Sequence, residues 1–276
     1  MFIFLQKIVP QHLLSRLVGW VAGSRIIWVK RAFIHWAIGR YQVDMADALE
    51  GDPDAYASFN AFFTRALKPG TRPIAPSLCS PADGAISECG DIQAGQLLQA
   101  KGIHYRLEQL MAGGDTEAYR NGTFATVYLS PRDYHRVHCP IKGTLIAARY
   151  VPGKLFSVNQ QTADAIPGLF AVNERLVMEF KTEDGPVCVV MVGAMIVAGI
   201  QPIWRDAPYP ARELFIERVI ESVSDEKSDG IANTTFESGD ELGRFLMGST
   251  AIVLTAKRYS LKHKAGDEVR MGESLV

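Results

Sequence analysis

Residues 185–204 read GPVCVVMVGAMIVAGIQPIW and carry no charged side chain. Valine and isoleucine prevail in this stretch, and both are typical of strands because a branched Cβ packs well on a pleated surface. Gly193 and Gly199 interrupt the run and favour close approach between strands over one continuous helix. The stretch therefore predicts consecutive buried strands and not a membrane-spanning helix.

Short apolar segments of the same kind recur from residue 80 onward, separated by Gly, Pro and Asp. Few long helical patterns stand between them, and strands at such spacing are typical of an antiparallel sheet. The predicted fold class is therefore α+β, with a mainly antiparallel β body. The segments are 84–87, 96–99, 124–129, 143–150, 176–180, 187–192 and 251–255.

Two parts of this body are similar to each other. Residues 83–99 and 264–275 each run from a glycine turn through a short strand to a second glycine turn. Such units resemble the hairpins of biotinyl and lipoyl carrier barrels, so we expect carrier-barrel-like hairpin units in the body. A carrier function is not expected, because the sequence has no Met-Lys-Met or Asp-Lys-Ala tripeptide at a hairpin tip.

The N-terminal region differs from the body in charge. The whole chain has 29 basic and 30 acidic residues, yet residues 1–43 hold six basic residues and no acidic one. Trp20, Trp28 and Trp36 lie in the same region among aliphatic residues at roughly helical spacing. Basic charge, tryptophan and aliphatic residues in this pattern are typical of amphipathic helices in a membrane interface.

We therefore predict two parts of the chain, an amphipathic membrane-docking helical region at 1–48 and a catalytic β-rich domain at 49–276. A helical pair that packs on the body with solvated charges is the plainer alternative. A membrane span is not expected, because Arg16, Arg25 and Lys30 interrupt the run of about 20 apolar residues that a span requires. A secretory signal peptide also fits poorly, since no small-residue cleavage site follows a suitable apolar run.

Composition excludes further classes of protein. A formal charge of −1 argues against a nucleic-acid partner bound by bulk electrostatics. The four cysteines are widely scattered and show no Cys-x-x-Cys or Cys/His ligand spacing, so neither a metal site nor a disulfide scaffold is expected. Unpaired cysteines suit a reducing compartment, and the expected location is the cytoplasmic side of a membrane.

The segment LSPRDYHRVHCP, residues 129–140, is the first candidate for chemistry. His135 and His138 lie three residues apart among charged residues, and prolines brace both ends of the segment. Histidine suits proton transfer because its ordinary pKa lies near neutrality. A metal pair or merely structural histidines are the alternatives.

The segment GDELGRFLMGST, residues 239–250, runs directly into the predicted strand 251–255. A turn at the strand entrance is the plain interpretation. Gly248, however, has no side chain to shield its carbonyl group, and the hydroxyl of Ser249 follows that carbonyl immediately. If a base removes the hydroxyl proton, Ser249 can attack its own preceding peptide bond.

A third candidate is Asp83 in the segment SPADG, residues 80–84. Asp-Gly is a common turn, which is the plain interpretation. A carboxylate in a rigid turn can also orient a histidine and stabilise its charged form, as in a catalytic triad. The order of such a triad would be Asp83, His138 and Ser249.

These motifs resemble those of the bacterial phosphatidylserine decarboxylases, and the resemblance covers nearly the whole chain. The two-histidine block followed by Gly-Ser-Thr near the C-terminus is highly specific. In one departure, Met247 stands where the family usually has leucine, and we expect little effect because both are apolar. The matching segments are FNAFFTRALKPGTRPI (59–74), SPADG (80–84), LSPRDYHRVHCP (129–140), VGA (192–194) and GDELGRFLMGST (239–250). The first of them predicts a short helix that places Phe59, Phe62 and Phe63 on one face.

The resemblance implies that the chain cuts itself between Gly248 and Ser249 into a β chain, 1–248, and an α chain, 249–276. Ser249 would become a pyruvoyl group, the covalent pyruvate cofactor, whose ketone takes up the electrons released on decarboxylation. Carried over by position, Asp83, His138 and Ser249 form the self-processing triad, and His135 assists decarboxylation.

The implied activity is that of a carboxy-lyase that turns phosphatidylserine into phosphatidylethanolamine and CO2. The implied partners are this lipid, an anionic membrane surface and the β/α heterodimer, which is expected to dimerise further. The implied location is peripheral, on the cytoplasmic side of the cell membrane. Arg132 and Arg136 lie in the block where the lipid phosphate is expected.

Two other interpretations remain open at this point. A serine hydrolase or lipase would use Asp83, His138 and Ser249 as an ordinary triad, but the Gly-x-Ser-x-Gly motif of many such enzymes does not surround Ser249. A non-catalytic membrane-binding module with a carrier-like barrel would leave the two histidines without a role.

Overall fold

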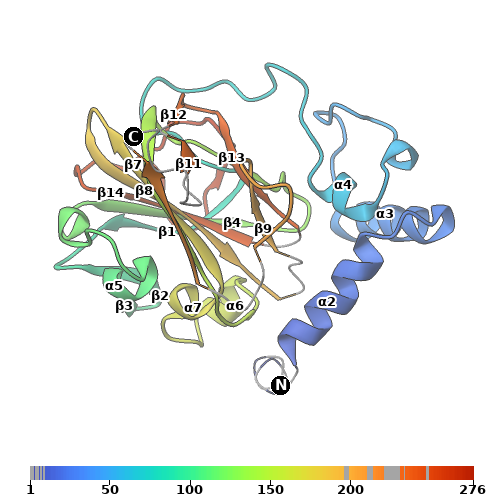
Figure 1. The fold of residues 1–276 in the computed structure, drawn as a ribbon, viewed down its shortest axis with the longest axis horizontal. Coiled ribbons are helices and arrows are strands. Elements are labelled where there is room, and N and C mark those ends of the chain that lie inside the picture. The colour runs from blue at the N-terminus through green and yellow to red at the C-terminus, as the bar shows by residue number, and fades with distance from the viewer. Residues whose placement is uncertain are drawn as a thin grey trace.

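The computed structural model describes residues 3, 6, 8, 10–195, 199–209, 214–220, 231–232, 234–246 and 249–276. Its N-terminal part is helical and lies beside a β-rich body, as Figure 1 shows. This part consists of helices α2 (Gln11–Ala22), α3 (Ile27–Tyr41) and α4 (Phe59–Phe63), with a 3-10 turn, η1 (Pro53–Ala55).

The body is organised by one large sheet in the order β11-β10-β6-β7-β8-β14-β4-β1-β15, with β12 also paired to β6. Its neighbours are antiparallel except for β10 and β11. The strands are β1 (Gly84–Asp91), β4 (Thr123–Leu129), β6 (Gly143–Val151), β7 (Arg175–Thr182), β8 (Gly185–Gly193), β10 (Phe215–Ile220), β11 (Ile231–Ala232), β12 (Thr235–Phe236), β14 (Ser249–Thr255) and β15 (Glu268–Val269).

Two smaller sheets and several short helices cover this sheet. One small sheet has the order β5-β13-β9, and the other pairs β2 with β3. The additional elements are β2 (Gln96–Ala100), β3 (Ile103–Arg106), β5 (Arg136–His138), β9 (Ile200–Pro202), β13 (Glu241–Phe245), α5 (Leu107–Met111), η2 (Glu117–Tyr119), α6 (Gln160–Ala163) and α7 (Leu169–Val172).

Strand β8 explains why the stretch at 185–204 lacks charge. Successive side chains of a strand point to opposite faces, and both faces of β8 are covered. Cys188, Val190 and Val192 lie in the core that includes α5 and α7, whereas Val189 and Met191 lie in the core that includes β5, β9 and β13. A strand buried on both sides reads as a continuous apolar run.

The α+β class and the antiparallel body are confirmed, and all seven predicted strand segments lie within β1, β2, β4, β6, β7, β8 and β14. The predicted short helix is α4, whose three phenylalanines are buried. Residues 196–198 of the opening stretch lie outside the described residues. The carrier-barrel likeness, the amphipathic character of the N-terminal helices and the boundary at residue 48 stay predictions.

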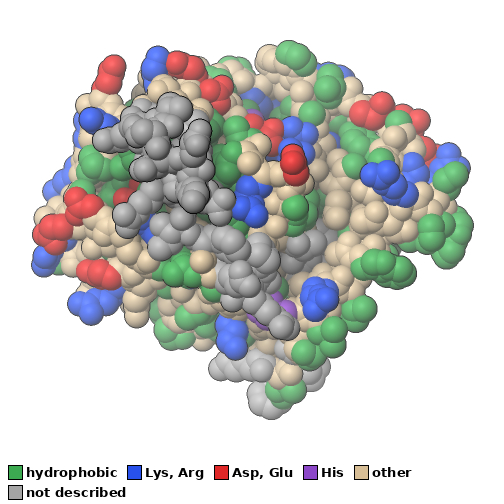
Figure 2. Space-filling view, viewed as in Figure 1, with side chains coloured by type: hydrophobic (Ala, Val, Ile, Leu, Met, Phe, Trp, Pro, Cys, Tyr) green, Lys and Arg blue, Asp and Glu red, His purple; other side chains and the backbone are tan. Residues whose placement is uncertain are grey.

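One contact joins helix α2 to the body, and another joins α3 to α4 within the N-terminal part. The backbone N–H of Leu155 donates to Gln11 Oε1 at 2.8 Å, which holds the start of α2. The ring of Phe33 on α3 stacks on Phe59 of α4 with 4.1 Å between centroids. Between these contacts both helices expose hydrophobic and basic side chains, which Figure 2 shows along their outer surface. None of the described helices is long and apolar enough to cross a membrane.

Candidate active site

Ser249 is the first residue of β14, a central strand of the large sheet. Its Cα lies opposite Gly193 on β8 and Leu129 on β4. The side chain is fully buried, and its hydroxyl has no hydrogen-bond partner among the described residues. Gly248 and Met247, the predicted cleavage residue and its neighbour, lie outside the described part of the chain.

His135 is buried completely beneath α4. Its Nδ1 lies 2.8 Å from the carbonyl oxygen of Asp133, so Nδ1 carries the proton and donates it. The ring of Phe63 lies on the imidazole with 3.9 Å between centroids. Burial, with the positive charge of Arg65 nearby, lowers the pKa of His135 to about 3. The ring is therefore neutral near pH 7, and its Nε2 lone pair has no partner within the described structure.

His138 lies on β5 and is nearly buried. Its Nδ1 donates to the carbonyl oxygen of Gly239 at 2.8 Å, so Nε2 accepts the hydroxyl proton of Tyr134 at 3.0 Å. Burial lowers the pKa of His138 below its ordinary value. The backbone N–H of His138 also donates to the carbonyl oxygen of Pro81 at 2.8 Å, which joins β5 to the segment 80–84.

Asp83 is held by an arginine rather than by a histidine. Arg72 Nε donates to Asp83 Oδ1 at 2.9 Å, and Arg72 Nη2 donates to Oδ2 at 2.6 Å. The backbone N–H of Met271 donates to Oδ1 at 2.8 Å. Arg72 also contacts Asp47 at 2.7 Å, and these two carboxylates raise its pKa. The carboxyl group of Asp83 is thus held by donors from two other loops.

The four predicted site residues gather at connected places but do not form a hydrogen-bonded chain. Ser249 pairs with Leu129, the first residue of the two-histidine block, 129–140. The turn that holds Asp83 bonds to the backbone of His138. Among the described residues, no hydrogen bond joins the side chains of Asp83, His138 and Ser249.

The end of α4 clamps the two-histidine block in place. Arg136 Nε donates to the carbonyl oxygen of Thr64 at 2.9 Å. Arg65 Nη2 donates to the carbonyl oxygen of Arg132 at 3.1 Å. Together with the Phe63 ring on His135, these contacts explain why the segments 59–74 and 129–140 occur in one site.

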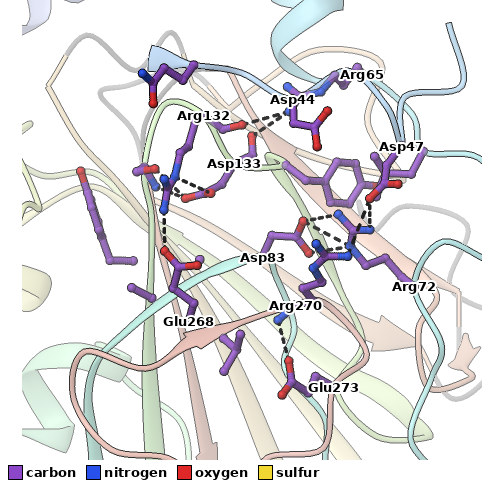
Figure 3. Close-up of a pocket in the computed structure, with 18 residues that line it drawn as sticks. Asp44, Asp47, Arg65, Arg72, Asp83, Arg132, Asp133, Glu268, Arg270 and Glu273 are labelled. Carbon is purple, nitrogen blue, oxygen red and sulfur yellow. Dashed lines mark hydrogen bonds and ion pairs between the residues drawn. The ribbon is translucent and has the colours of Figure 1, made fainter. Parts of the chain in front are cut away.

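A cavity of about 690 Å³ opens beside Asp83, between the body and the loop that follows α3. Figure 3 shows arginines and carboxylates mixed around it. Arg132 lines the cavity, whereas Arg136 instead pairs with Glu241 at 2.7 Å. The described lining includes Asp83 but neither Ser249 nor the two histidines. The labelled lining residues are Asp44, Asp47, Arg65, Arg72, Asp83, Arg132, Asp133, Glu268, Arg270 and Glu273.

Several residues of the site were not singled out from the sequence. Tyr134 and Asp133 lie inside the two-histidine block, and an ionisable residue next to a candidate histidine is a signal that could have found them. Burial raises the pKa of Asp133, whose Oδ2 accepts the Ser130 hydroxyl at 2.7 Å. Nothing in the sequence pointed to Arg72, because its pairing with Asp83 forms only in the folded chain.

Known proteins similar to this chain give a consistent result. The sequence model described as phosphatidylserine decarboxylase matches residues 59–276, and one described as PSD matches residues 1–42. The phosphatidylserine decarboxylase proenzyme of Pseudomonas fluorescens (strain Pf-5) is 49% identical over 285 residues, covering 100% of this chain and 96% of that protein. The proenzyme of Pseudomonas entomophila (strain L48) is 52% identical over 286 residues, covering 100% and 97%. That of Pseudomonas aeruginosa (strain LESB58) is 52% identical over 287 residues, covering 100% and 96%.

Fold and site define an α+β protein with one candidate catalytic centre, built near a buried serine at the start of a central strand. Two buried histidines and a charged cavity belong to the same region. By the match over residues 59–276 and the identity along its full length, the chain belongs to the phosphatidylserine decarboxylase family. The resemblance drawn from the motifs is confirmed.

Proposed function

We propose that this chain is a carboxy-lyase that converts phosphatidylserine to phosphatidylethanolamine and CO2 after cutting itself between Gly248 and Ser249. The observation that carries the proposal is the Ser249 hydroxyl, which is buried and unpaired among the described residues. Buried hydroxyl groups normally have a partner, because an unpaired one costs free energy. Family membership supports the proposal, since the related chains are named proenzymes of this decarboxylase.

The sheet supports the expectation that the cut chains stay together. Residues 249–255 pair with β8 on one side and with β4 on the other. A cut before Ser249 assigns β14 to the α chain, 249–276, while both neighbouring strands belong to the β chain, 1–248. The two chains then share one core and one hydrogen-bonded sheet, and form a heterodimer. Further dimerisation of this heterodimer stays a prediction.

Self-cleavage needs a base for the Ser249 hydroxyl, and we assign this role to His138. Its lowered pKa keeps the ring neutral near pH 7, with a lone pair on Nε2. When Tyr134 gives up its bond to Nε2, that atom takes the Ser249 proton and Oγ bonds to the Gly248 carbonyl carbon. The peptide nitrogen takes up a proton as its bond to that carbon breaks, which leaves an ester between Ser249 Oγ and Gly248. Loss of the Ser249 Cα proton then expels Gly248 as a carboxylate, and hydrolysis of the resulting dehydroalanine releases ammonia and gives the ketone. Asp83 acts through the turn that bonds the backbone of His138.

The residues around Ser249 fit a pyruvoyl group at this position. Burial excludes water, and Gly193 places no side chain of its own opposite residue 249. When formed, the group supplies a ketone that takes up the electrons left as CO2 departs. His135 is neutral and has a free Nε2 lone pair, so we assign to it the proton traffic at the substrate: Nε2 takes a proton from the ammonium group of the entering lipid and returns it to the substrate carbon after CO2 has left.

The N-terminal helices support a peripheral location on an anionic membrane. Trp20 is 79% exposed, Trp28 74% and Trp36 52%, and Arg16 and Arg25 are exposed beside them. Tryptophan and basic side chains together favour the interface of a bilayer with anionic lipids. The charged cavity borders the loop after α3, which suits a lipid headgroup presented from the cytoplasmic membrane surface.

Mass measurement tests the self-cleavage. Under denaturing conditions we expect two fragments, the smaller beginning at residue 249 and carrying a carbonyl that borohydride reduces. Under native conditions the two fragments should migrate as one complex. S249A should fold, stay uncut and lack decarboxylase activity, and an active S249A protein would contradict the assignment. One intact wild-type chain that reacts with a fluorophosphonate would instead support the serine hydrolase, an interpretation that the comparisons do not support.

A further inference from the structure

Glu174 lies in one row with Ser249 across the large sheet. The backbone N–H of Gly193 donates to the carbonyl oxygen of Glu174 at 2.9 Å, so these two residues are neighbours across β7 and β8. Gly193 in turn lies opposite Ser249 across β8 and β14. Directly opposed residues of an antiparallel pair project to the same face of the sheet. Glu174 and Ser249 therefore project to one face, with a glycine between them.

The carboxyl group of Glu174 fills the space that a side chain on Gly193 would take. A Cβ placed on Gly193 would lie 2.9 Å from Glu174 Cγ and 3.1 Å from Glu174 Oε1. Opposed Cβ atoms of paired strands are about 4.5–5.5 Å apart. The Glu174 carboxyl thus lies on the same face of the sheet as the Ser249 side chain, in the space over the intervening Gly193.

The surroundings of Glu174 are apolar and neutral. Its side chain is almost fully buried, and the Tyr150 hydroxyl on β6 donates to Oε2 at 3.1 Å. The Tyr209 ring stacks on that of Tyr150 with 4.7 Å between centroids. Arg175 follows in sequence but turns away, because its guanidinium donates to backbone carbonyl groups of α5. Across the sheet, the positions in register on β8 and β14 are the uncharged Gly193 and Ser249. The charged Arg205 lies over the Tyr209 ring, 4.5 Å from its centroid.

We propose that Glu174 is a positioning residue for self-cleavage, whose carboxylate accepts the hydrogen bond of the Ser249 hydroxyl just before Oγ attacks. This inference rests on the proposed function. It gives the Ser249 hydroxyl, unpaired among the described residues, a partner in the same buried space. The bond fixes the Ser249 rotamer and needs the ionised form of Glu174. The single hydroxyl proton then turns from Glu174 to Nε2 of His138, which removes it as Oγ attacks.

Ionisation of Glu174 gives the inference a distinct signature. Burial raises the pKa of Glu174 to about 7, and the Tyr150 hydrogen bond opposes that rise. The rate of cleavage should therefore increase with pH through an inflection near 7. His138 does not produce this inflection, because its lowered pKa leaves the ring neutral above about pH 6.5.

The experiment follows cleavage of freshly translated, pulse-labelled full chain that is diluted into buffers from pH 5.5 to 9. E174Q keeps the shape of the side chain and an acceptor for Tyr150 but does not ionise. We expect E174Q to cleave at least about tenfold more slowly at pH 8, with no inflection near 7, while thermal unfolding shows a folded chain. E174D should restore the inflection at a reduced rate.

Two further variants separate positioning from structure. E179Q is the matched control, because Glu179 is a buried carboxylate on the same strand that faces Arg149 on the opposite side of the sheet. It should keep both the rate and the inflection of the wild type. Y150F removes a donor to the ionised form of Glu174, so the pKa rises and the inflection should move to higher pH.

The outcomes distinguish this inference from the proposed function. E174Q that cleaves at the wild-type rate with the wild-type pH profile would overturn the role of Glu174 and leave the decarboxylase assignment intact. If E174Q does not fold, an unshifted inflection in Y150F overturns the role. A wild-type chain that stays uncut at every pH overturns the proposed function, and this inference falls with it.

Discussion

Burial acts on two residues of the site in ways that determine their chemistry. It disfavours the charged form of each group, so His135 becomes a neutral base with a pKa of about 3 and Glu174 becomes a carboxyl group with a pKa of about 7. His135 is therefore uncharged near neutral pH, whereas Glu174 is partly ionised there. Asp83 differs in its contacts, because Arg72 and a backbone N–H donate hydrogen bonds to its carboxyl group.

The pKa of His135 makes stability depend on pH. The unfolded chain binds a proton at this residue near pH 6.5, whereas the folded chain does so only near pH 3. The neutral, buried ring of His135 therefore makes its full contribution to the free energy of unfolding above pH 6.5. This contribution is lost as the pH falls toward 3. In H135N, whose amide can still donate to the Asp133 carbonyl, this loss should be absent.

Urea unfolding at pH 7 and pH 5 measures the effect. The free energy of unfolding of the wild type relative to H135N should fall by about 2 kcal/mol between these two pH values, since one proton corresponds to about 1.4 kcal/mol per pH unit. Comparison with H135N removes the contributions of all other groups. A difference that stays constant with pH would mean that His135 is solvated and titrates normally.

At the scale of elements, the short helix α4 joins the N-terminal helices to the two-histidine block. Phe59 packs on Phe33 of α3, whereas Phe63 packs on His135. Thr64 and Arg65, directly after the helix, bond to the block. A five-residue helix has little stability of its own, so these contacts determine its position.

Two variants of α4 separate stability from activity. F63A and F59A each remove a buried ring and should lower the free energy of unfolding by about 3–5 kcal/mol. Only F63A uncovers the imidazole of His135, so kcat for decarboxylation by the folded enzyme should fall about tenfold or more in F63A and little in F59A. Equal kcat values for the two folded variants would show that the Phe63 ring does not position His135.

At the scale of the whole molecule, the net charge of −1 is the sum of a basic N-terminal segment and an acidic remainder of the chain. The basic, tryptophan-bearing segment forms α2 and α3 beside the body, and the body carries the acidic excess. Lys30 and Arg31 both contact Asp54 in η1. Lys30 Nζ donates to the Asp54 carbonyl oxygen at 2.9 Å, and Arg31 pairs with the Asp54 carboxylate at 3.0 Å. Arg16 and Arg25 are the better probes of membrane binding.

The double variant R16Q/R25Q should weaken binding to vesicles that contain anionic lipid by about tenfold or more at low salt. Each basic residue near such a surface contributes about 1 kcal/mol, and screening reduces this in high salt. Sedimentation with vesicles measures the effect. K101Q/R106Q, on the exposed β2–β3 hairpin of the body, is the control and should bind as the wild type does. Unchanged binding of R16Q/R25Q at low salt would leave the helices a structural role only.

The sequence by itself determined the α+β class, the seven strand segments and the family, because these depend on local information. A run such as 185–193 is apolar wherever it lies, and the order of residues in 129–140 is specific without coordinates. Only the tertiary structure decided the partners of the charged and polar groups. Three contacts illustrate this, because each brings together groups that approach only when the chain folds. They are the pairs Arg72–Asp83 and Tyr134–His138, and the placement of Glu174 in the space beside Gly193. Burial, hydrogen-bond partners and pKa all depend on these contacts, so they follow from the packed core and not from the order of residues.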